Sequence, residues 1–413
     1  MTTTINNEQK KLNAPNSTDT GNAIRNLPNL RFPEFSEEWE EHELSEYIDF
    51  KNGLNPKPNQ FGKGIKFISV MDILNNAVIT YDCIRASVSV SEEDMSAFSV
   101  QKGDILFQRS SETLEDVGRA NVYVDDKPAV FGGFVIRGKQ KTNYNPLFFK
   151  YLLSSPLARK RIIRMGAGAQ HFNIGQEGLS KVKLPFACID EQNKIAKILF
   201  LLDKRILLQN KIIEDLKNLK IAIIEKLYSK IQGKEYSYGQ MFDVVNERNK
   251  QMEYSNILSA SQEKGMVNRD DLNLDIQFER SNINTYKIVR KGDYVIHLRS
   301  FQGGFAFSDK LGVCSPAYTI LRPNNLLEYG YLSNYFTSQR FIKSLIIVTY
   351  GIRDGRSINV DEWLRMKITI PPKEHQQYIV KVIGTFERKI EDEEAYATQL
   401  SIQKQYLLRQ MFI

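Results

Sequence analysis

The sequence has little cysteine and no long run of apolar residues. Its three cysteines, at positions 83, 188 and 314, are far apart, odd in number and outside any Cys-x-x-Cys pair. They offer neither a disulfide framework nor a zinc knuckle, which fits the reducing environment of the cytoplasm. The most apolar segment, residues 195–208, is interrupted by lysine, aspartate and arginine, so no segment approaches the ~20 apolar residues of a membrane span. We therefore expect a cytoplasmic protein without a membrane-spanning segment.

The composition is that of an ordinary folded protein. Of the 413 residues, 42% are hydrophobic and 25% are charged, so the chain is neither disordered nor fibrous, and its length allows two or three domains. The excess of 56 Lys and Arg over 49 Asp and Glu gives a net charge of +7, which favours an anionic partner only weakly. Residues 1–26 are polar and lack the apolar core of a signal peptide, so we expect a disordered tail there.

The chain repeats itself with a long period. The clearest alignment has a constant offset of 184 residues and pairs Ile195 with Ile379, Leu202 with Phe386, and Ile206 with Ile390. Upstream, Lys-Gly-Asp at 102–104 lies over Lys-Gly-Asp at 291–293, and residues 171–174 lie over 357–360. The order of these markers is the same in both halves, while the sequences between them have diverged. This pattern indicates one scaffold used twice, each copy with its own variable surface loops.

Each copy begins with a segment of mixed character. Residues 27–190 and 233–374 contain short strand-like runs separated by Gly, Asn, Asp and Pro, and each segment also contains a predicted helix, at 145–165 and 329–346. Each segment has the size of one domain. The sequence therefore predicts two similar mixed α/β domains.

Each domain is followed by a long amphipathic helix, at residues 191–232 and 375–413. In the first helix one heptad position holds Ile195, Leu202, Leu216 and Ile223, and a second holds Ile198, Ile212 and Leu219. About five heptads in each helix predict a coiled coil. The alternative is an amphipathic helix lying on its own domain. Some 40 residues at ~1.5 Å each span ~60 Å, however, which exceeds what such a domain can cover.

The connectivity suggests how these helices pair. A domain, a helix, a second domain and a second helix can bury both apolar stripes if the helices run antiparallel. The predicted fold is thus α+β, with two similar mixed α/β domains separated by two long helices, paired as an antiparallel coiled coil with a pseudo-two-fold internal repeat.

Three segments of the sequence resemble the specificity (S) subunits of type I restriction–modification systems. Residues 28–35, Pro-Asn-Leu-Arg-Phe-Pro-Glu-Phe, followed by Trp39, resemble the opening of that family. Leu-Pro at 184–185 followed by Glu-Gln at 191–192 resembles the start of its central conserved helix. Ile-Pro at 370–371 followed by His-Gln at 375–376 resembles the distal copy, with His375 where Glu is usual. The resemblance covers essentially the whole chain after residue 26.

The resemblance implies a DNA-binding specificity subunit without catalytic activity of its own. The two domains, 27–190 and 233–374, would be target recognition domains that each read one half of a bipartite, asymmetric sequence in double-stranded DNA. The helices 191–232 and 375–413 would hold two methylation (M) subunits, which bring S-adenosylmethionine, and motor-nuclease (R) subunits would join that complex. No cofactor is implied for this chain itself. Two unlike modules on a pseudo-two-fold frame also suit a duplex, whose strands are two-fold related.

A stand-alone DNA methyltransferase or nuclease and a structural adaptor are the alternative classes of function. A stand-alone DNA methyltransferase needs an Asn/Asp-Pro-Pro-aromatic loop, but residues 145–148, Asn-Pro-Leu-Phe, lack the second proline. The glycine-bearing strings at 61–64 and 131–134 do not follow a strand and open a helix, as a cofactor loop should. The four histidines, at 42, 171, 297 and 375, share no metal-ligand spacing. The sequence does not exclude a cluster of carboxylates that acts as a nuclease site. A purely structural coiled-coil adaptor, the other alternative, would not need two domains with polar loops.

Polar loops that leave a strand in both copies are the predicted sites of DNA contact. Arg, Lys, Asn and Gln read base edges, and hydroxyls and cations bind phosphates. The loop at 108–111 matches 297–302, and the glycine-bearing loop at 166–171 matches 350–356. A basic helical segment lies at 159–164. The alternative for each is an ordinary solvated surface. The predicted DNA-contacting residues are Gln108, Arg109, Ser110, Arg159, Arg164, Gln170, His171, Arg299, Gln302, Arg353 and Arg356.

Overall fold

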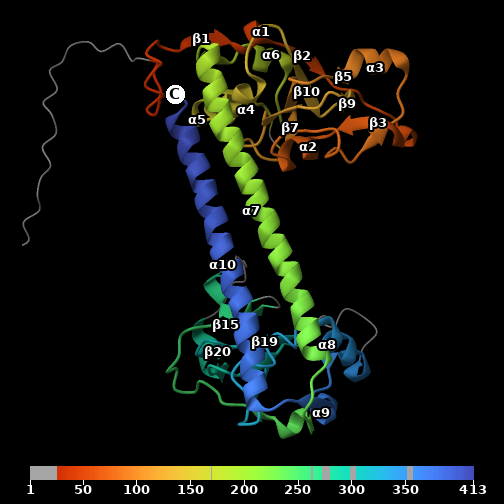
Figure 1. Ribbon diagram of the computed structural model, residues 1–413, viewed down its shortest axis with the longest axis vertical. Helices are drawn as coiled ribbons and strands as arrows, with labels where there is room; N and C mark the ends of the chain where they lie inside the picture. Colours follow the sequence, from red (N-terminus) through yellow and green to blue (C-terminus); the bar gives the residue numbers. More distant parts are fainter. Residues whose placement is uncertain (1–25, 169, 262–263, 272–279, 298–303, 351–356) are drawn as a thin grey trace, which may run out of the picture. The chain divides into compact units, whose positions relative to one another are not determined.

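The computed structural model describes residues 26–168, 170–261, 264–271, 280–297, 304–350 and 357–413. The chain forms two compact units (Figure 1). The first unit comprises the chain up to Leu207 together with Gln399–Ile413, and the second comprises Leu208–Thr398. The tail predicted at 1–26 lies outside the described residues apart from Asn26. No helix in the described part of the chain combines the length and the apolarity of a membrane span.

The first unit is built on a four-stranded antiparallel sheet. Its strands, in spatial order, are β2 (Ile48–Asn52), β10 (Val135–Gln140), β6 (Ile105–Gln108) and β8 (Ala120–Val122). A second sheet contains β4 (Ser87–Val88), β3 (Phe61–Ile68), β9 (Ala129–Phe131) and β5 (Ser99–Val100), and its β3–β9 pair is parallel. Two shorter pairs are β1 (Glu40–Glu43) with β12 (Lys183–Phe186) and β7 (Ser110–Ser111) with β11 (Phe172–Asn173). The short helices are α1 (Leu44–Tyr47), η1 (Pro58–Gln60), α2 (Val70–Asn75), α3 (Glu92–Phe98), α4 (Pro146–Ser154), α5 (Pro156–Ile163) and α6 (Gln176–Ser180).

The second unit repeats the main sheet in the same order. Its strands are β14 (Phe242–Val245), β21 (Thr319–Pro323), β18 (Tyr294–Ile296) and β19 (Phe305–Phe307). Four two-stranded pairs accompany it: β13 (Lys234–Ser237) with β24 (Lys367–Ile370), β15 (Leu258–Ser261) with β16 (Gly265–Asn268), β17 (Lys287–Val289) with β20 (Gly312–Cys314), and β22 (Thr349–Tyr350) with β23 (Ser357–Ile358). The short helices are η2 (Tyr238–Gln240), η3 (Arg269–Asp271), η4 (Arg280–Thr285), α8 (Gln339–Ser344), η5 (Leu345–Val348) and α9 (Val360–Arg365). The predicted pair of similar mixed α/β domains is confirmed.

The repeated Lys-Gly-Asp string forms the same turn in both units. Gly103 has φ +95° and Gly292 has φ +94°, a backbone conformation that residues with a side chain rarely adopt. The following aspartates are buried, and each accepts a hydrogen bond from a backbone N–H three residues earlier, at 2.9 Å for Asp104 and 2.8 Å for Asp293. The string therefore persists because it shapes the entry into β6 and β18.

The two predicted short helices differ from the structure. The segment 145–165 divides into α4 and α5 because Pro156 begins a new helix, with Ser155 as an N-cap that accepts from the Ala158 N–H at 3.3 Å. Within the predicted helix 329–346 of the second unit, only Gln339–Ser344 is α-helical, and the 3₁₀ turn η5 follows it. Gly330, with φ +72°, gives the chain a turn where a helix was predicted.

Two long helices complete the fold, α7 (Ile189–Ser229) and α10 (Lys373–Gln410). Within the first unit, Ile195 and Leu199 of α7 share a core with Met411 and Phe412, which follow α10. Within the second unit, Ile224 and Tyr228 of α7 share a core with Ile379 and Ile383 of α10. In each unit, therefore, the start of one long helix and the end of the other are packed into the same domain core.

The seam between the long helices follows a regular heptad, but not at every predicted position. Ile195, Leu199, Leu202 and Ile213 are buried, whereas Ile198, Ile212 and Leu219 are 38–47% exposed. The second seam column of α7 is thus 199, 206, 213, 220 and 227. The sequence pattern also places the apolar members of this column, Leu199, Ile206, Ile213 and Leu227, in a wider apolar stripe. The helices run antiparallel in each unit, since Asp203 meets Lys404 in the first, and Lys220 meets Glu387 while Gln209 meets Glu393 in the second.

The interhelical contacts obey the same 184-residue offset as the sequence. Asp203 and Lys404 in the first unit correspond to Glu387 and Lys220 in the second, with N–O distances of 2.5 and 2.7 Å. Asp203 also receives the buried Lys150 Nζ at 3.1 Å and the Tyr151 hydroxyl at 2.7 Å, both from α4. The ion pair in the first unit is therefore tied into the domain core.

The Glu-Gln and His-Gln strings explain how each long helix is fixed to its domain. The side-chain amide of Gln192 accepts from the Asn145 N–H at 3.0 Å and donates to the Ala187 carbonyl at 2.9 Å. Gln376 makes the equivalent bonds, from the Glu328 N–H at 2.7 Å and to the Pro371 carbonyl at 3.0 Å. Both glutamines are buried.

The neighbouring Glu191 has a role that its counterpart lacks. It is fully buried and accepts two hydrogen bonds of 2.7 Å from the Arg31 guanidinium and one of 3.0 Å from the Trp39 indole. Arg31 and Trp39 lie in residues 28–39, at the start of the first domain and before β1. In the second unit the corresponding strand β13 follows the end of α7 after only residues 230–233. His375 occupies the position that matches Glu191, and it is exposed. The described residues of the second unit include no counterpart of Arg31 and Trp39, so this position does not need a carboxylate.

Candidate nucleic-acid interface

Two of the loops predicted from sequence lie side by side in the first unit. Strand β7 pairs with β11, with Ser110 opposite Asn173, and Ala167 forms a further bridge to Asn173. The Ser110 hydroxyl bonds to the Asn173 side chain, and the Ile174 N–H donates to the Arg109 carbonyl at 2.9 Å. The segments 108–111 and 166–171, which are far apart in the sequence, therefore form one surface.

The residues of the first loop have different surroundings. Gln108 is buried, and its amide donates to the Ser110 carbonyl at 3.0 Å, while its Oε1 has no hydrogen-bond partner among the described residues. The half-buried Arg109 guanidinium donates to the Gly133 carbonyl at 3.3 Å. Ser110 is partly exposed. Gln108 thus shapes the loop from within, whereas Arg109 and Ser110 reach its surface.

The second loop presents its predicted residues to solvent. Gln170 and His171 are both exposed, and the His171 carbonyl accepts from the Asn173 side chain at 3.3 Å. Asn173 was not among the residues predicted from sequence. Its position next to a matched loop was the signal, but only the strand pairing shows that it joins the two loops.

The basic segment at 159–164 separates into an inner and an outer arginine. The partly buried Arg159 guanidinium donates to the carbonyls of Val117 at 2.6 Å and Glu115 at 2.9 Å. Burial, with a smaller effect of the nearby Arg119 charge, lowers the pKa of Arg159 to about 10. Arg164, at the end of α5, is exposed. The geometry gives Arg159 intramolecular partners in a neighbouring loop and leaves Arg164 available for an external one.

The predicted residues of the second unit lie outside the described residues. These are Arg299, Gln302, Arg353 and Arg356. The strands that border them are described: β18 ends at Ile296, β19 begins at Phe305, and the β22–β23 pair brackets residues 351–356. His297 follows β18 directly, and burial lowers its pKa.

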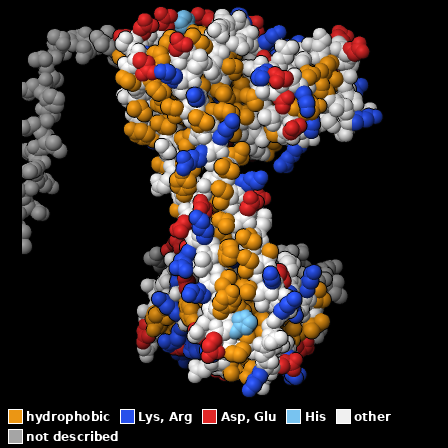
Figure 2. All heavy atoms as spheres, in the orientation of Figure 1, with side chains coloured by type: hydrophobic (Ala, Val, Ile, Leu, Met, Phe, Trp, Pro, Cys, Tyr) orange, Lys and Arg blue, Asp and Glu red, His pale blue; other side chains and the backbone are white. Residues whose placement is uncertain are grey.

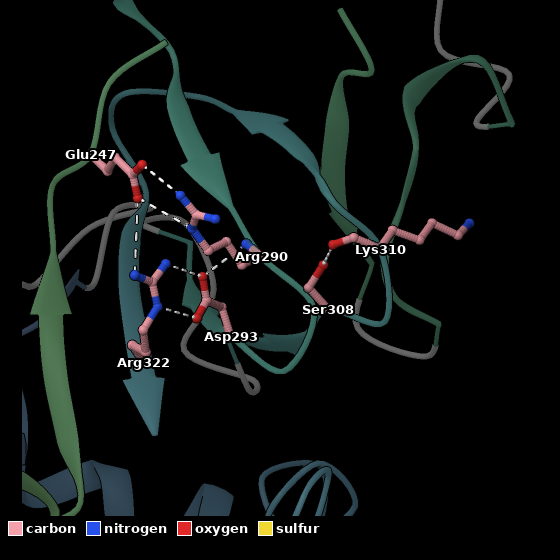
Figure 3. A network of polar contacts seen from close by, with 6 residues as sticks. All are labelled: Glu247, Arg290, Asp293, Ser308, Lys310 and Arg322. Atoms are coloured by element: carbon pink, nitrogen blue, oxygen red, sulfur yellow. Dashed lines mark hydrogen bonds and ion pairs between the residues drawn. The ribbon is translucent and has the colours of Figure 1, made fainter. Parts of the chain in front are cut away.

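A network of ion pairs fixes the base of β18 in the second unit (Figure 3). Arg322 of β21 donates to both carboxylate oxygens of Asp293 at 2.9 and 3.0 Å, and Arg290 donates to Glu247 at 2.8 Å. Hydrogen bonding to Arg290 lowers the pKa of Glu247, and the bond to Asp293 raises that of Arg322. Both arginines are thus engaged within the protein and position the strand that leads to residues 298–303.

The string that a methyltransferase loop would require has a structural role in the first unit. The Asn145 side chain accepts from the Leu147 and Phe148 N–H groups at 3.0 and 3.1 Å, so Asn-Pro-Leu-Phe is the capped start of α4. Residues 132–134 form the turn between β9 and β10. Across the described ranges, no group of three His, Cys, Asp or Glu is placed to hold a metal ion. Figure 2 shows basic and acidic side chains intermixed on the visible face of each unit.

The chain is similar to known restriction–modification proteins along most of its length. The family described as type I restriction modification DNA specificity domain matches it twice, over residues 36–218 and 233–400. The putative type I restriction enzyme MjaX specificity subunit of Methanocaldococcus jannaschii is 24% identical over 395 residues, which cover 89% of this chain and 91% of that protein. The type I restriction enzyme EcoKI specificity subunit of Escherichia coli K12 is 27% identical over 134 residues, which cover 32% and 28% of the two chains.

A solved structure shares the fold. The crystal structure of the type I restriction–modification S subunit from M. genitalium superposes with a TM-score of 0.55 at 15% identity, covering 94% of this chain and 99% of that one. The predicted fold of two similar domains and long helices is confirmed by this likeness and by the topology of each unit.

Proposed function

The chain belongs to the type I restriction–modification DNA specificity family, and from this premise we propose that it selects the DNA target of a methylation and restriction complex. Each unit would read one half of a bipartite, asymmetric sequence in double-stranded DNA. The observation that carries the proposal is the duplication itself, with one sheet order present in both units and one family domain matched twice.

The difference between the units supports unlike half-sites. Beside the shared main sheet, the first unit has the mixed sheet β4-β3-β9-β5, whereas the second has the separate pairs β15–β16 and β17–β20. Sequence is read by side chains that reach base edges, and a change of the surrounding strands and loops changes those side chains. Two unlike reading surfaces on a common scaffold thus fit an asymmetric target.

The long helices offer a surface for the methylation subunits. Ile198, Leu201, Leu208, Ile212 and Leu219 of α7 are 38–60% exposed and occupy two adjacent heptad columns on one side of the seam. Figure 2 shows hydrophobic side chains along the visible face of the long helices. An exposed apolar stripe of this kind is typical of a protein interface. In this proposal two M subunits dock on the helices and bring S-adenosylmethionine, and R subunits join the complex.

A stand-alone methyltransferase or nuclease is the alternative function. The Asn-Pro string that a methyltransferase would use is a helix cap here, which favours the non-catalytic role. The experiment is to mix the purified chain with duplex DNA and labelled S-adenosylmethionine, with and without M subunits. We expect labelled adenine only when M subunits are present. Methyl transfer or cleavage by the chain alone would contradict the proposal.

A further inference from the structure

An exposed aromatic side chain lies beside the candidate interface of the first unit. Phe134, on the turn between β9 and β10, is 69% exposed, whereas Phe131 at the start of the same Phe-Gly-Gly-Phe string is fully buried. The Phe134 carbonyl accepts from the Arg109 N–H at 2.9 Å, so the turn is joined directly to the loop that carries Arg109 and Ser110. An isolated exposed hydrophobic residue needs no explanation, but one on a fixed turn next to polar reading residues does.

The turn that carries Phe134 is held firmly in place. The Leu54 N–H donates to the Phe131 carbonyl at 2.9 Å, and the Arg109 side chain donates to the Gly133 carbonyl at 3.3 Å. A Cβ on Gly133 would lie 1.9 Å from Asn55 Oδ1, so a side chain at position 133 would displace the side chain of Asn55. The backbone that carries Phe134 is thus fixed in advance, and little backbone entropy would be lost when Phe134 makes a contact.

Phe134 forms one side of an apolar pocket of about 500 Å³. Met71 and Phe61, on other sides of it, are 60% and 43% exposed. The apolar lining is completed by Leu54, Pro56, Phe67, Val70 and Val135. Ser110 and Asn55 contribute polar groups to the same pocket, so the apolar surface continues into the loop predicted to contact DNA.

The charge around the pocket favours a nucleic acid as its partner. Residues 53–71, which supply eight of the thirteen lining residues, include Lys57, Lys63 and Lys66 and no acidic residue. Lys57 and Lys63 are exposed. An apolar pocket whose lining segment carries exposed lysines suits a base edge flanked by phosphates.

We propose that Phe134 and Met71 read a thymine in the half-site of the first unit, by apolar contact with its C5-methyl group in the major groove. Thymine is the only base with an apolar group on that edge, and phenylalanine is among the side chains that contact it. Ser110 and Arg109 would lie against the neighbouring polar edges and phosphates. This inference rests on the proposed function and adds one base and two specificity-determining residues to it.

The test removes the methyl group from DNA and the aromatic ring from the protein. The complex of the chain with its methylation subunits is titrated with target duplexes in which each thymine, one at a time, is replaced by deoxyuridine. We expect one position, in one half-site only, where deoxyuridine weakens wild-type binding by about fourfold, the effect of one buried methyl group. The variants Phe134→Ala and Met71→Ala should weaken binding of the thymine target and bind both duplexes equally.

A matched control and the opposing outcomes keep the two proposals separate. Leu74→Ala changes a 39% exposed residue of the same helix α2 that does not line the pocket, and it should retain the preference for thymine. Sequence-specific binding with equal affinity for thymine and deoxyuridine at every position would overturn this inference and leave the proposed function intact. Impaired subunit assembly of Phe134→Ala with an unchanged preference for thymine would also overturn this inference alone. A complex without sequence-specific binding would overturn the proposed function itself.

Discussion

Arg159 and Arg164 lie on one basic segment, yet their side chains have opposite surroundings. Arg159 is turned inward onto the carbonyls of Glu115 and Val117, and Arg164 is exposed. The inward arginine holds the loop between β7 and β8, which belongs to the candidate interface. Two arginines of one segment therefore have different roles: Arg159 stabilises the shape of the candidate interface, and Arg164 is available to contact DNA.

We predict different effects for the two alanine variants. Arg159→Ala should lower the free energy of unfolding of the first unit by about 1–3 kcal/mol, because two carbonyls lose a charged donor. Arg164→Ala should leave stability unchanged and, if Arg164 contacts a phosphate, reduce the slope of log affinity against log salt by about one. Urea unfolding and DNA titration at several salt concentrations measure both quantities. A stable Arg159→Ala protein with the lower salt slope would reverse the assignment.

The two long helices carry the same ion pair twice, in different settings. Asp203 is 5% exposed and bonded to Lys150 and Tyr151 as well as Lys404, whereas Glu387 is 41% exposed and pairs with Lys220. Burial alone would raise the pKa of Asp203, but the charges of Lys150 and Lys404 outweigh it and lower that pKa. Burial lowers the pKa of Lys150.

We predict that the buried copy dominates the stability of the helix pair. Asp203→Ala should cost about 3 kcal/mol because it leaves Lys150 buried without a counter-charge. The matched variant Glu387→Ala should cost less than about 1 kcal/mol, since exposed pairs contribute little. Hydrogen exchange of the α4 and α9 amides would follow the two units separately. An equal loss of unfolding free energy in the two variants would contradict the prediction that the buried ion pair contributes more.

The ion pairs of Asp203 also predict that the stability of the first unit depends on pH. Because the pKa of Asp203 is lower in the folded state, its contribution is fully present above its unfolded value of about 3.9 and is lost as pH falls through the folded value. The stability of the first unit should therefore fall more steeply below about pH 4 in the wild type than in Asp203→Asn. Thermal unfolding between pH 2 and pH 6, a range of about four units around that value, checks the difference.

The exposed stripe of α7 leads to a prediction about assembly. Leu208→Lys should weaken binding of a methylation subunit at least tenfold, about 1.4 kcal/mol, because it places a charge in the proposed apolar contact. Leu207→Lys is the control, since Leu207 is 63% exposed but lies about 100° away around the helix, outside the two columns. Sedimentation of mixtures of the two proteins measures the affinity. If both variants assembled normally, the stripe would not be the docking surface.

At the scale of the whole molecule, the duplication predicts that the target is modular. Replacing residues 27–190 by the equivalent domain of a relative should change one half-site and leave the other intact. The reciprocal exchange of residues 233–374 should change only the other half-site. Methylation-sensitive sequencing of DNA from cells that express each chimera with the partner subunits reads both outcomes. A change in both half-sites from a single exchange would contradict the assignment of one unit to one half-site.

The sequence alone determined the features that depend on periodicity and repetition. The offset of 184 residues, the two mixed domains and the two long helices could all be predicted, because an apolar heptad and a repeated Lys-Gly-Asp turn are local patterns that the backbone follows directly. The glutamines at 192 and 376 marked the helix starts for the same reason. These features also carried the resemblance to the family.

Only the tertiary structure decided which side chains face outward. Gln108 and Arg109 are adjacent in sequence, but β7 and the β9–β10 turn bury the first and leave the second at the surface. Phe134 belongs to a string without the pattern of a cofactor loop, and its backbone is held by a hydrogen bond from the Arg109 N–H, far away in the chain. Burial depends on such non-local packing, which no short pattern records. The order of the helices and strands could therefore be predicted from the sequence. Which side chains form the candidate interface depends on the tertiary contacts between those elements.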